Sequence, residues 1–194
     1  YLNTGSQYDP STDSWSATTT TSAPTARHRH TAVWSTSSNR MIIWGGANGS
    51  GSLNTGGRYD PSGNSWTATT TTSAPAARYY HTAIWSTTNS RMIVWGGTNN
   101  GSTPINTGGQ YDPSGNSWTA TTTTGAPTAR VGHVMVYSTV NNKVVVWGGN
   151  DLSTNYYNTG GQYDPSGNSW TATSTTNAPG ARQNATATWC PYND

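Results

Sequence analysis

The 194-residue sequence contains no Phe, no Glu and a single cysteine, Cys190, and only 8% of its residues are charged. A lone thiol can form neither an internal disulfide nor a Cys-based zinc site. The net charge of +2 is spread without a basic cluster, whereas nucleic-acid binding normally requires a basic patch or stripe. No run of 18 apolar residues is present, so we expect no membrane-spanning helix.

Motifs for catalysis are equally scarce. In the absence of Glu, the paired carboxylates of a glycosidase would have to come from seven Asp residues, most of which lie in turn-like segments. No phosphate-binding loop occurs in the sequence. We therefore predict that the chain is not an enzyme and that it holds no cofactor and no metal.

Aromatic residues compensate for a low apolar content. Only 31% of the residues are hydrophobic, yet the chain has ten Trp and eleven Tyr. Burying one aromatic side chain removes about 200 Å² from water, so a few of them can replace many smaller residues in a core. Disordered chains are poor in aromatic and β-branched residues, and this composition therefore indicates a folded protein.

A unit of about 51 residues is repeated along the chain. The triplet Tyr-Asp-Pro recurs at spacings of 51, 52 and 52 residues, and three other short motifs keep the same period. The recurring positions are Tyr8, Tyr59, Tyr111 and Tyr163; Trp15, Trp66, Trp118 and Trp170; Arg27, Arg78, Arg130 and Arg182; and the doublets Gly45-Gly46, Gly96-Gly97 and Gly148-Gly149, each after a Trp.

Each unit reads as four short strands, A to D. In the unit that starts at Arg27 we expect strands at 30–34, 41–44, 54–59 and 66–72, separated by turn-forming residues. Strand B is apolar on both faces, which is typical of a strand covered on both sides. A single four-stranded sheet cannot bury both faces, so the copies must stack on one another, and radial stacking gives a β-propeller.

The Gly doublet after strand B, the Tyr in strand C and the Trp about seven residues later resemble the Kelch repeat. The resemblance covers nearly the whole chain, and the uniformity of the copies is similar to that of bacterial repeat proteins. It implies an all-β fold, a Kelch-type β-propeller segment of about four blades, each a four-stranded antiparallel sheet, with incomplete first and last blades.

The units divide the chain as 1–26 (strands C and D of a partial blade), 27–77, 78–129 and 130–181 (three full blades) and 182–194 (a single strand A at 185–189). Fifteen strands are thus expected where four complete blades need sixteen. We expect residues 1–194 to be a propeller domain, or part of a larger one, completed by further sequence or by another copy of the chain.

Binding residues are expected on one face of the disc. The B–C and D–A loops lie together on that face because the strands alternate in direction, and they are the segments that differ between copies. The candidates for contact with a partner are His28, Arg29, Tyr79, Tyr80, Tyr156 and Tyr157, although unconstrained surface variation would give the same pattern.

Other recurring polar residues suit structural roles. The repeated Arg, as at Arg78 and Arg130, and the repeated Asp each occur four times, which suggests a structural pair or a hydrogen-bonded anchor in each blade. The recurring His30, His81 and His133 favour structural hydrogen bonding over a ring of metal ligands.

These observations favour a non-catalytic Kelch-repeat scaffold for protein–protein interaction or self-assembly, with a protein partner or another copy of the chain. A carbohydrate-binding propeller that uses loop aromatics and Asn is the alternative, and a propeller domain of a larger secreted enzyme is the third reading. Low charge, richness in Thr, Ser and Asn, and three glycosylation sequons at Asn48, Asn100 and Asn184 lead us to expect an extracellular or cell-surface location.

Overall fold

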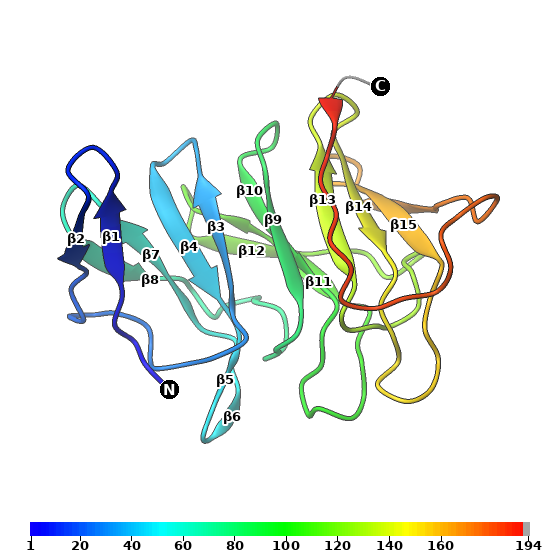
Figure 1. Ribbon diagram of the computed structural model, residues 1–194, viewed down its shortest axis with the longest axis horizontal. Helices are drawn as coiled ribbons and strands as arrows, with labels where there is room; N and C mark the ends of the chain where they lie inside the picture. The colour runs from blue at the N-terminus through cyan, green and yellow to red at the C-terminus, as the bar shows by residue number, and fades with distance from the viewer. Residues whose placement is uncertain (192–194) are drawn as a thin grey trace.

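A computed structural model describes residues 1–191 and contains three four-stranded antiparallel sheets and two two-stranded ones (Figure 1). The partial blade consists of β1 (Ser6–Asp9) and β2 (Ser14–Ala17). The first full blade consists of β3 (Thr31–Ser35), β4 (Arg40–Trp44), β7 (Gly56–Asp60) and β8 (Ser65–Ala68). The second consists of β9 (Thr82–Ser86), β10 (Arg91–Trp95), β11 (Gly108–Asp112) and β12 (Ser117–Ala120). The third consists of β13 (Val134–Ser138), β14 (Lys143–Trp147), β15 (Gly160–Asp164) and β16 (Ser169–Ala172).

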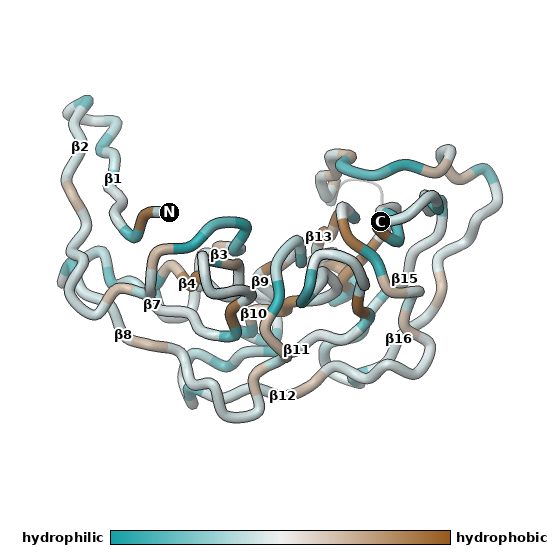
Figure 2. The backbone as a smooth tube through the Cα atoms, turned by 90° about the horizontal axis from the view of Figure 1, so that it is seen from below, coloured by the Kyte–Doolittle hydropathy of each residue, from teal (hydrophilic) through white to brown (hydrophobic). Residues whose placement is uncertain are grey.

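The sheets are arranged radially, as a propeller requires. Within each full blade the strands pair in the order A, B, C, D, and the A strands β3, β9 and β13 are neighbours across blades at the inner side of the arc. Figure 2 shows the blades following an open arc from the N-terminal hairpin to the C-terminal segment. The expected radial arrangement of four-stranded antiparallel blades is thereby confirmed.

Turn chemistry explains why consecutive strands fold back on each other. In the C–D turn after β7, the Asp60 carboxylate accepts hydrogen bonds from the backbone and hydroxyl of Ser62 at 2.9 and 2.6 Å. Asn64 then takes a left-handed conformation (φ 42°), which Asn tolerates better than most residues. The second and third blades repeat this turn.

The hydrophobic core lies between blades rather than within them. We call the side of a blade that faces the next blade in sequence its leading face, and the opposite side its trailing face. Ile42 and Trp44 on the leading face of the first blade pack on Met92 and Val94 of the second. Ile93 and Trp95 of the second blade pack in the same way on the third. β10, the B strand of the second blade, is apolar on both sides because it serves both of these interfaces.

Three details differ from the sequence-based expectation. Residues 185–189 form no strand, because a strand A pairs within its blade only with strand B, and no such partner is present among the described residues. The D strand expected at 66–72 ends at Ala68, where the chain turns to bond with the next blade. A short hairpin, β5 (Ala47–Asn48) with β6 (Gly51–Ser52), was not expected in the first B–C loop.

The final part of the segment 182–194, residues 192–194, lies outside the described residues. Within the described part, no helix is long and apolar enough to cross a bilayer.

Candidate functional site

The repeated Arg is a buried anchor of the backbone. Arg78 is fully buried, and its guanidinium donates to the carbonyl oxygens of Ala76 at 2.9 Å, Gly96 at 3.0 Å and Thr107 at 2.6 Å. Burial lowers its pKa to about 10. Arg27 and Arg130 bind the equivalent carbonyls in their own blades. The sequence left two roles open for this Arg, a pair with the repeated Asp or a hydrogen-bonded anchor. The hydrogen bonds to backbone carbonyls show that it is an anchor.

The repeated Asp pairs instead with a basic residue at the start of strand B. The ion pairs are Arg40–Asp60 at 2.9 Å, Arg91–Asp112 at 3.2 Å and Lys143–Asp164 at 2.8 Å. Sequence reasoning missed these basic partners. A signal was present, since the residue before each apolar B run is Arg or Lys in all three full blades.

The repeated Tyr and Trp join one blade to the preceding one. In the second blade, the Tyr111 hydroxyl donates to Oδ1 of Asn116 at 2.6 Å, and the same oxygen accepts the backbone N–H of Thr70 at 2.9 Å. Nε1 of Trp118 donates to the Thr70 carbonyl oxygen at 3.2 Å. We call this Tyr–Asn–Trp arrangement and its backbone partner the interblade clamp.

The clamp recurs at every junction between described blades. Its members in the first blade are Tyr59, Asn64 and Trp66 on Thr19, and those in the third are Tyr163, Asn168 and Trp170 on Thr122. At each junction, two hydrogen bonds therefore reach a single residue that lies two positions beyond the end of strand D.

Two halves of a clamp remain open at the ends of the arc. In the partial blade, the Tyr8 hydroxyl donates to the Asp13 carboxylate at 2.8 Å, as Tyr does to Asn elsewhere. Trp15 is 70% exposed, whereas the equivalent Trp118 is 6% exposed. At the other end, Ser174 takes the place of Thr70 and Thr122, and no clamp side chain of residues 1–191 reaches it.

The recurring histidines bridge the inner parts of neighbouring blades. Nε2 of His81 lies 2.8 Å from the Thr31 hydroxyl oxygen, and its ring meets Trp44 edge-on at 5.4 Å. Burial, with a smaller contribution from the nearby Arg78, lowers the pKa of His81 to about 3. His133 repeats this contact with Thr82 and Trp95, and burial lowers its pKa to about 3 as well.

In the first two doublets, the first glycine makes room for that histidine. Gly45 has φ +72°, and a Cβ built on it would lie 2.6 Å from Cε1 of His81. Gly96 stands in the same relation to His133. Both the backbone conformation and the close approach therefore require glycine. The doublets Gly45-Gly46, Gly96-Gly97 and Gly148-Gly149 all have positive φ.

On the loop face, the B–C and D–A loops are hydrogen-bonded to each other. His28 pairs with Ala47, Tyr79 with Thr98 and Val131 with Asn150, each through isolated bridges. These bridges make the loop face a continuous surface on a rigid base; Figure 1 shows β5–β6 and the B–C loops at the lower side, opposite the A–B turns.

The six predicted contact residues form three groups on this face. Arg29 lies over the rings of Tyr80 at 4.3 Å and Tyr79 at 5.6 Å. His28 is separate from them and stacks on Tyr1 at 4.4 Å. Tyr157 is half-buried beneath the guanidinium of Arg130, 4.5 Å away, so it serves the scaffold.

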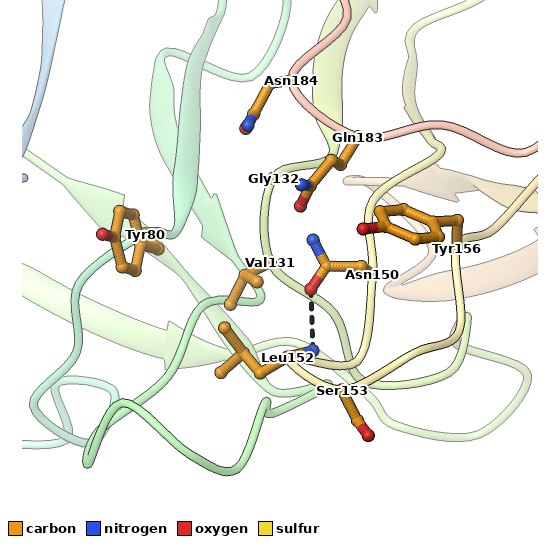
Figure 3. Close-up of a pocket in the computed structure, with 9 residues that line it drawn as sticks. All are labelled: Tyr80, Val131, Gly132, Asn150, Leu152, Ser153, Tyr156, Gln183 and Asn184. Atoms are coloured by element: carbon orange, nitrogen blue, oxygen red, sulfur yellow. Dashed lines mark hydrogen bonds between the residues drawn. The ribbon is translucent and has the colours of Figure 1, made fainter.

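Tyr156 belongs with Tyr80. It is 52% exposed and faces a cavity of about 330 Å³ that Tyr80 also lines (Figure 3). Sequence reasoning named the two tyrosines but not the cavity, whose other walls come from Val131, Asn150 and the segment after Arg182. In residues 1–191, no group of three or more His, Cys, Asp or Glu side chains is placed to hold a metal ion.

The comparisons with known proteins agree with this architecture. No curated protein matches the chain. The family model described as the Attractin/LZTR1 beta-propeller matches residues 1–189, which is nearly the whole sequence. The chain therefore belongs to the Attractin/LZTR1 β-propeller family, a Kelch-type propeller family.

Proposed function

We propose that the chain is a non-catalytic protein-interaction scaffold that associates head to tail with copies of itself. The observation that carries this proposal is the pair of open clamp halves. One end of the arc presents Trp15 and Asp13 without a backbone partner, and the other presents Ser174 without a clamp. Each is the half that the other lacks, and a neighbouring blade supplies it in either case, from further sequence of the same polypeptide or, as proposed here, from another copy of the chain.

The chemistry of the two halves is complementary. The indole N–H of Trp15 can donate to the Ser174 carbonyl oxygen of a second copy, as Trp118 does to Thr70. The Asp13 carboxylate can accept the Ser174 backbone N–H, as Asn116 accepts that of Thr70. A carboxylate acceptor makes a charge-assisted bond, which is stronger than the neutral one inside the chain.

Apolar surface is also uncovered at both ends of the arc, because the partial blade lacks strands A and B and no blade follows the third among residues 1–191. On the trailing face of the first blade, Trp34 is 46% exposed beside a hollow of about 460 Å³ that Met41 also lines. On the leading face of the third blade, Val136 and Trp147 line a hollow of about 360 Å³. Their equivalents inside the arc, such as Trp95 and Met92, are fully buried. Covering such surface favours association.

The contact is heterologous, because the surface at one end of the arc meets a different surface at the other end. Repetition of such a contact closes into a ring or continues as a filament, depending on the rotation between copies. The internal junctions are nearly identical to one another. We therefore expect the junction between two copies to have the same rotation as a junction between neighbouring blades, which favours a ring.

Light scattering tests the proposal. We expect a mass above the 20.5 kDa of one chain, which falls on dilution. Replacing Trp15 with Ala should weaken association by about tenfold or more, since buried aromatic anchors dominate interfaces. The matched control is Val140→Ala, an exposed apolar residue in the third A–B turn, which should leave the mass unchanged. A 20.5 kDa species at every concentration would contradict the proposal.

We also propose an extracellular or cell-surface location, supported by the low charge and the three sequons of the sequence. Display of the epitope-tagged full-length protein on intact cells would test the location. A carbohydrate ligand, the alternative to a protein partner, would use the loop face and not the ends of the arc.

A further inference from the structure

We propose that the loop-face cavity between the second and third blades binds a neutral saccharide of one or two units. The cavity has a volume of about 330 Å³, at the small end of the range for small-molecule sites. None of the clamp residues Asp13, Trp15 and Ser174 lines it. Its lining residues are Tyr80, Val131, Gly132, Asn150, Leu152, Ser153, Tyr156, Gln183 and Asn184 (Figure 3).

The polar groups of the cavity suit an uncharged ligand rich in hydroxyls. None of the nine lining residues is charged, and the neighbouring guanidinium of Arg29 is stacked on the Tyr80 ring at 4.3 Å. The amide of Gln183 offers donors and an acceptor. A sugar hydroxyl both donates and accepts, and adjacent hydroxyls can therefore pair with one amide. Oδ1 of Asn150 is used by the backbone N–H of Leu152 at 2.7 Å, which leaves its NH₂ group as a donor.

The walls and floor suit the apolar face of a sugar ring. Figure 3 shows Tyr80 and Tyr156 on opposite sides of the cavity, with Val131 and Leu152 between them. The two tyrosines are 41% and 52% exposed, and Val131 is buried. A tyrosine has an apolar ring and a polar tip. Its ring can therefore contact the C–H face of a pyranose while its hydroxyl forms a hydrogen bond with a hydroxyl at the edge of the sugar.

One residue of the cavity lining is held in an unfavourable backbone conformation. Leu152 has a φ of 64°, in the left-handed region that bulky residues rarely adopt, whereas the positive φ of Tyr80 and Asn184 recurs at the same position of the other two D–A loops. In the other two B–C loops the left-handed positions are glycines, Gly51 and Gly101. Strain of this kind costs about 1–3 kcal/mol per residue and concentrates at ligand sites, where it fixes the direction of side chains.

The aromatic wall occurs in only one of the three B–C loops. Tyr156 bridges Asn150 in the third blade, whereas Pro104 takes this place opposite Thr98 in the second. In the first blade Ser52 lies there, opposite Ala47. The repeat framework therefore does not require an aromatic residue at this position. Substitution of Ser52, which holds the equivalent position outside the cavity, is a matched control for substitution of Tyr156.

An array of neutral oligosaccharides tests the proposal: glucans, mannans, galactans and chitooligosaccharides, printed beside sialylated and sulfated glycans. We expect the full chain to retain neutral glycans and not acidic ones. For a retained glycan, calorimetry should show that Tyr156→Ala and Gln183→Ala each weaken binding about tenfold or more, the effect of removing a dominant contact. Ser52→Ala should bind like the unmodified chain.

Three results would overturn the assignment: retention of no neutral glycan, equal retention of acidic glycans, or undiminished binding by Tyr156→Ala. The variant Trp15→Ala separates the two proposals. It should lose self-association and keep the glycan, so a monomeric chain that still binds sugar rejects the scaffold assembly alone. A self-associating chain that binds no sugar rejects the cavity assignment alone.

Discussion

Replacing Arg78 with Met should lower the free energy of unfolding by about 3 kcal/mol, because three carbonyl oxygens each lose a guanidinium hydrogen bond worth about 1 kcal/mol, and only the Thr107 oxygen keeps another donor, the Gly96 N–H. These are the carbonyls of Ala76, Gly96 and Thr107. Met has a similar length and is apolar, so the change removes the donors with little loss of packing volume. Urea denaturation followed by Trp fluorescence measures the difference.

The fourth copy of the same Arg provides the control. Arg182 is exposed and donates to the Gly180 carbonyl oxygen at 2.9 Å but reaches no strand carbonyl in residues 1–191. Arg182→Met should therefore change the stability by less than about 0.5 kcal/mol. Equal losses for the two variants would show that the buried guanidinium is not the anchor of the blade.

The fold was predictable because the same pattern of strands and turns occurs several times in the sequence. A period of about 51 residues with Gly, Tyr and Trp at fixed places indicates a Kelch-type blade before any strand is assigned. Strand B was placed within one residue because an apolar run ended by a Gly doublet is unambiguous. Strand D was overextended, because Thr69–Thr72 has β-branched residues that favour a strand while its backbone bonds across blades to Asn116.

The site was only partly predictable for a different reason. Variation among copies identified the loop face and both exposed tyrosines of the cavity, Tyr80 and Tyr156. It could not distinguish them from Tyr157, which shields Arg130. The distinction depends on which side of a loop a residue faces, and a loop without regular periodicity gives no such information.

The open clamp also lay beyond sequence reasoning. Recurrence showed that Tyr and Trp have a structural role, but not that each Trp binds the preceding blade rather than its own. Because each Trp donates to the blade before it, Trp15 at one end has no acceptor, and Ser174 at the other end has no Trp donor, within residues 1–191. A motif search sees four equal Trp residues, whereas the packing leaves one of them, Trp15, exposed.

Acidification should destabilise the chain steeply between about pH 6 and pH 4.5. In this range an unfolded histidine binds a proton (usual pKa about 6.5), whereas His81 and His133 stay neutral in the fold because burial lowers each pKa to about 3. The unfolded state therefore binds more protons, and stability falls as pH falls. The limiting slope is about 1.4 kcal/mol per pH unit for each histidine, or about 2.7 for both.

The substitution His→Gln isolates this effect, because the Gln amide can keep the hydrogen bond to the Thr hydroxyl without titrating. One such change, at His81 or His133, should remove about half of the slope, and both changes should remove most of it. A smaller slope should remain from His30, whose pKa is also lowered by burial and by Arg27. The carboxylates Asp60, Asp112 and Asp164 have lowered pKa values and titrate below the measured range. An unchanged slope in the double variant would mean that these histidines gain protons without unfolding, and that the inner junctions between blades open at acid pH.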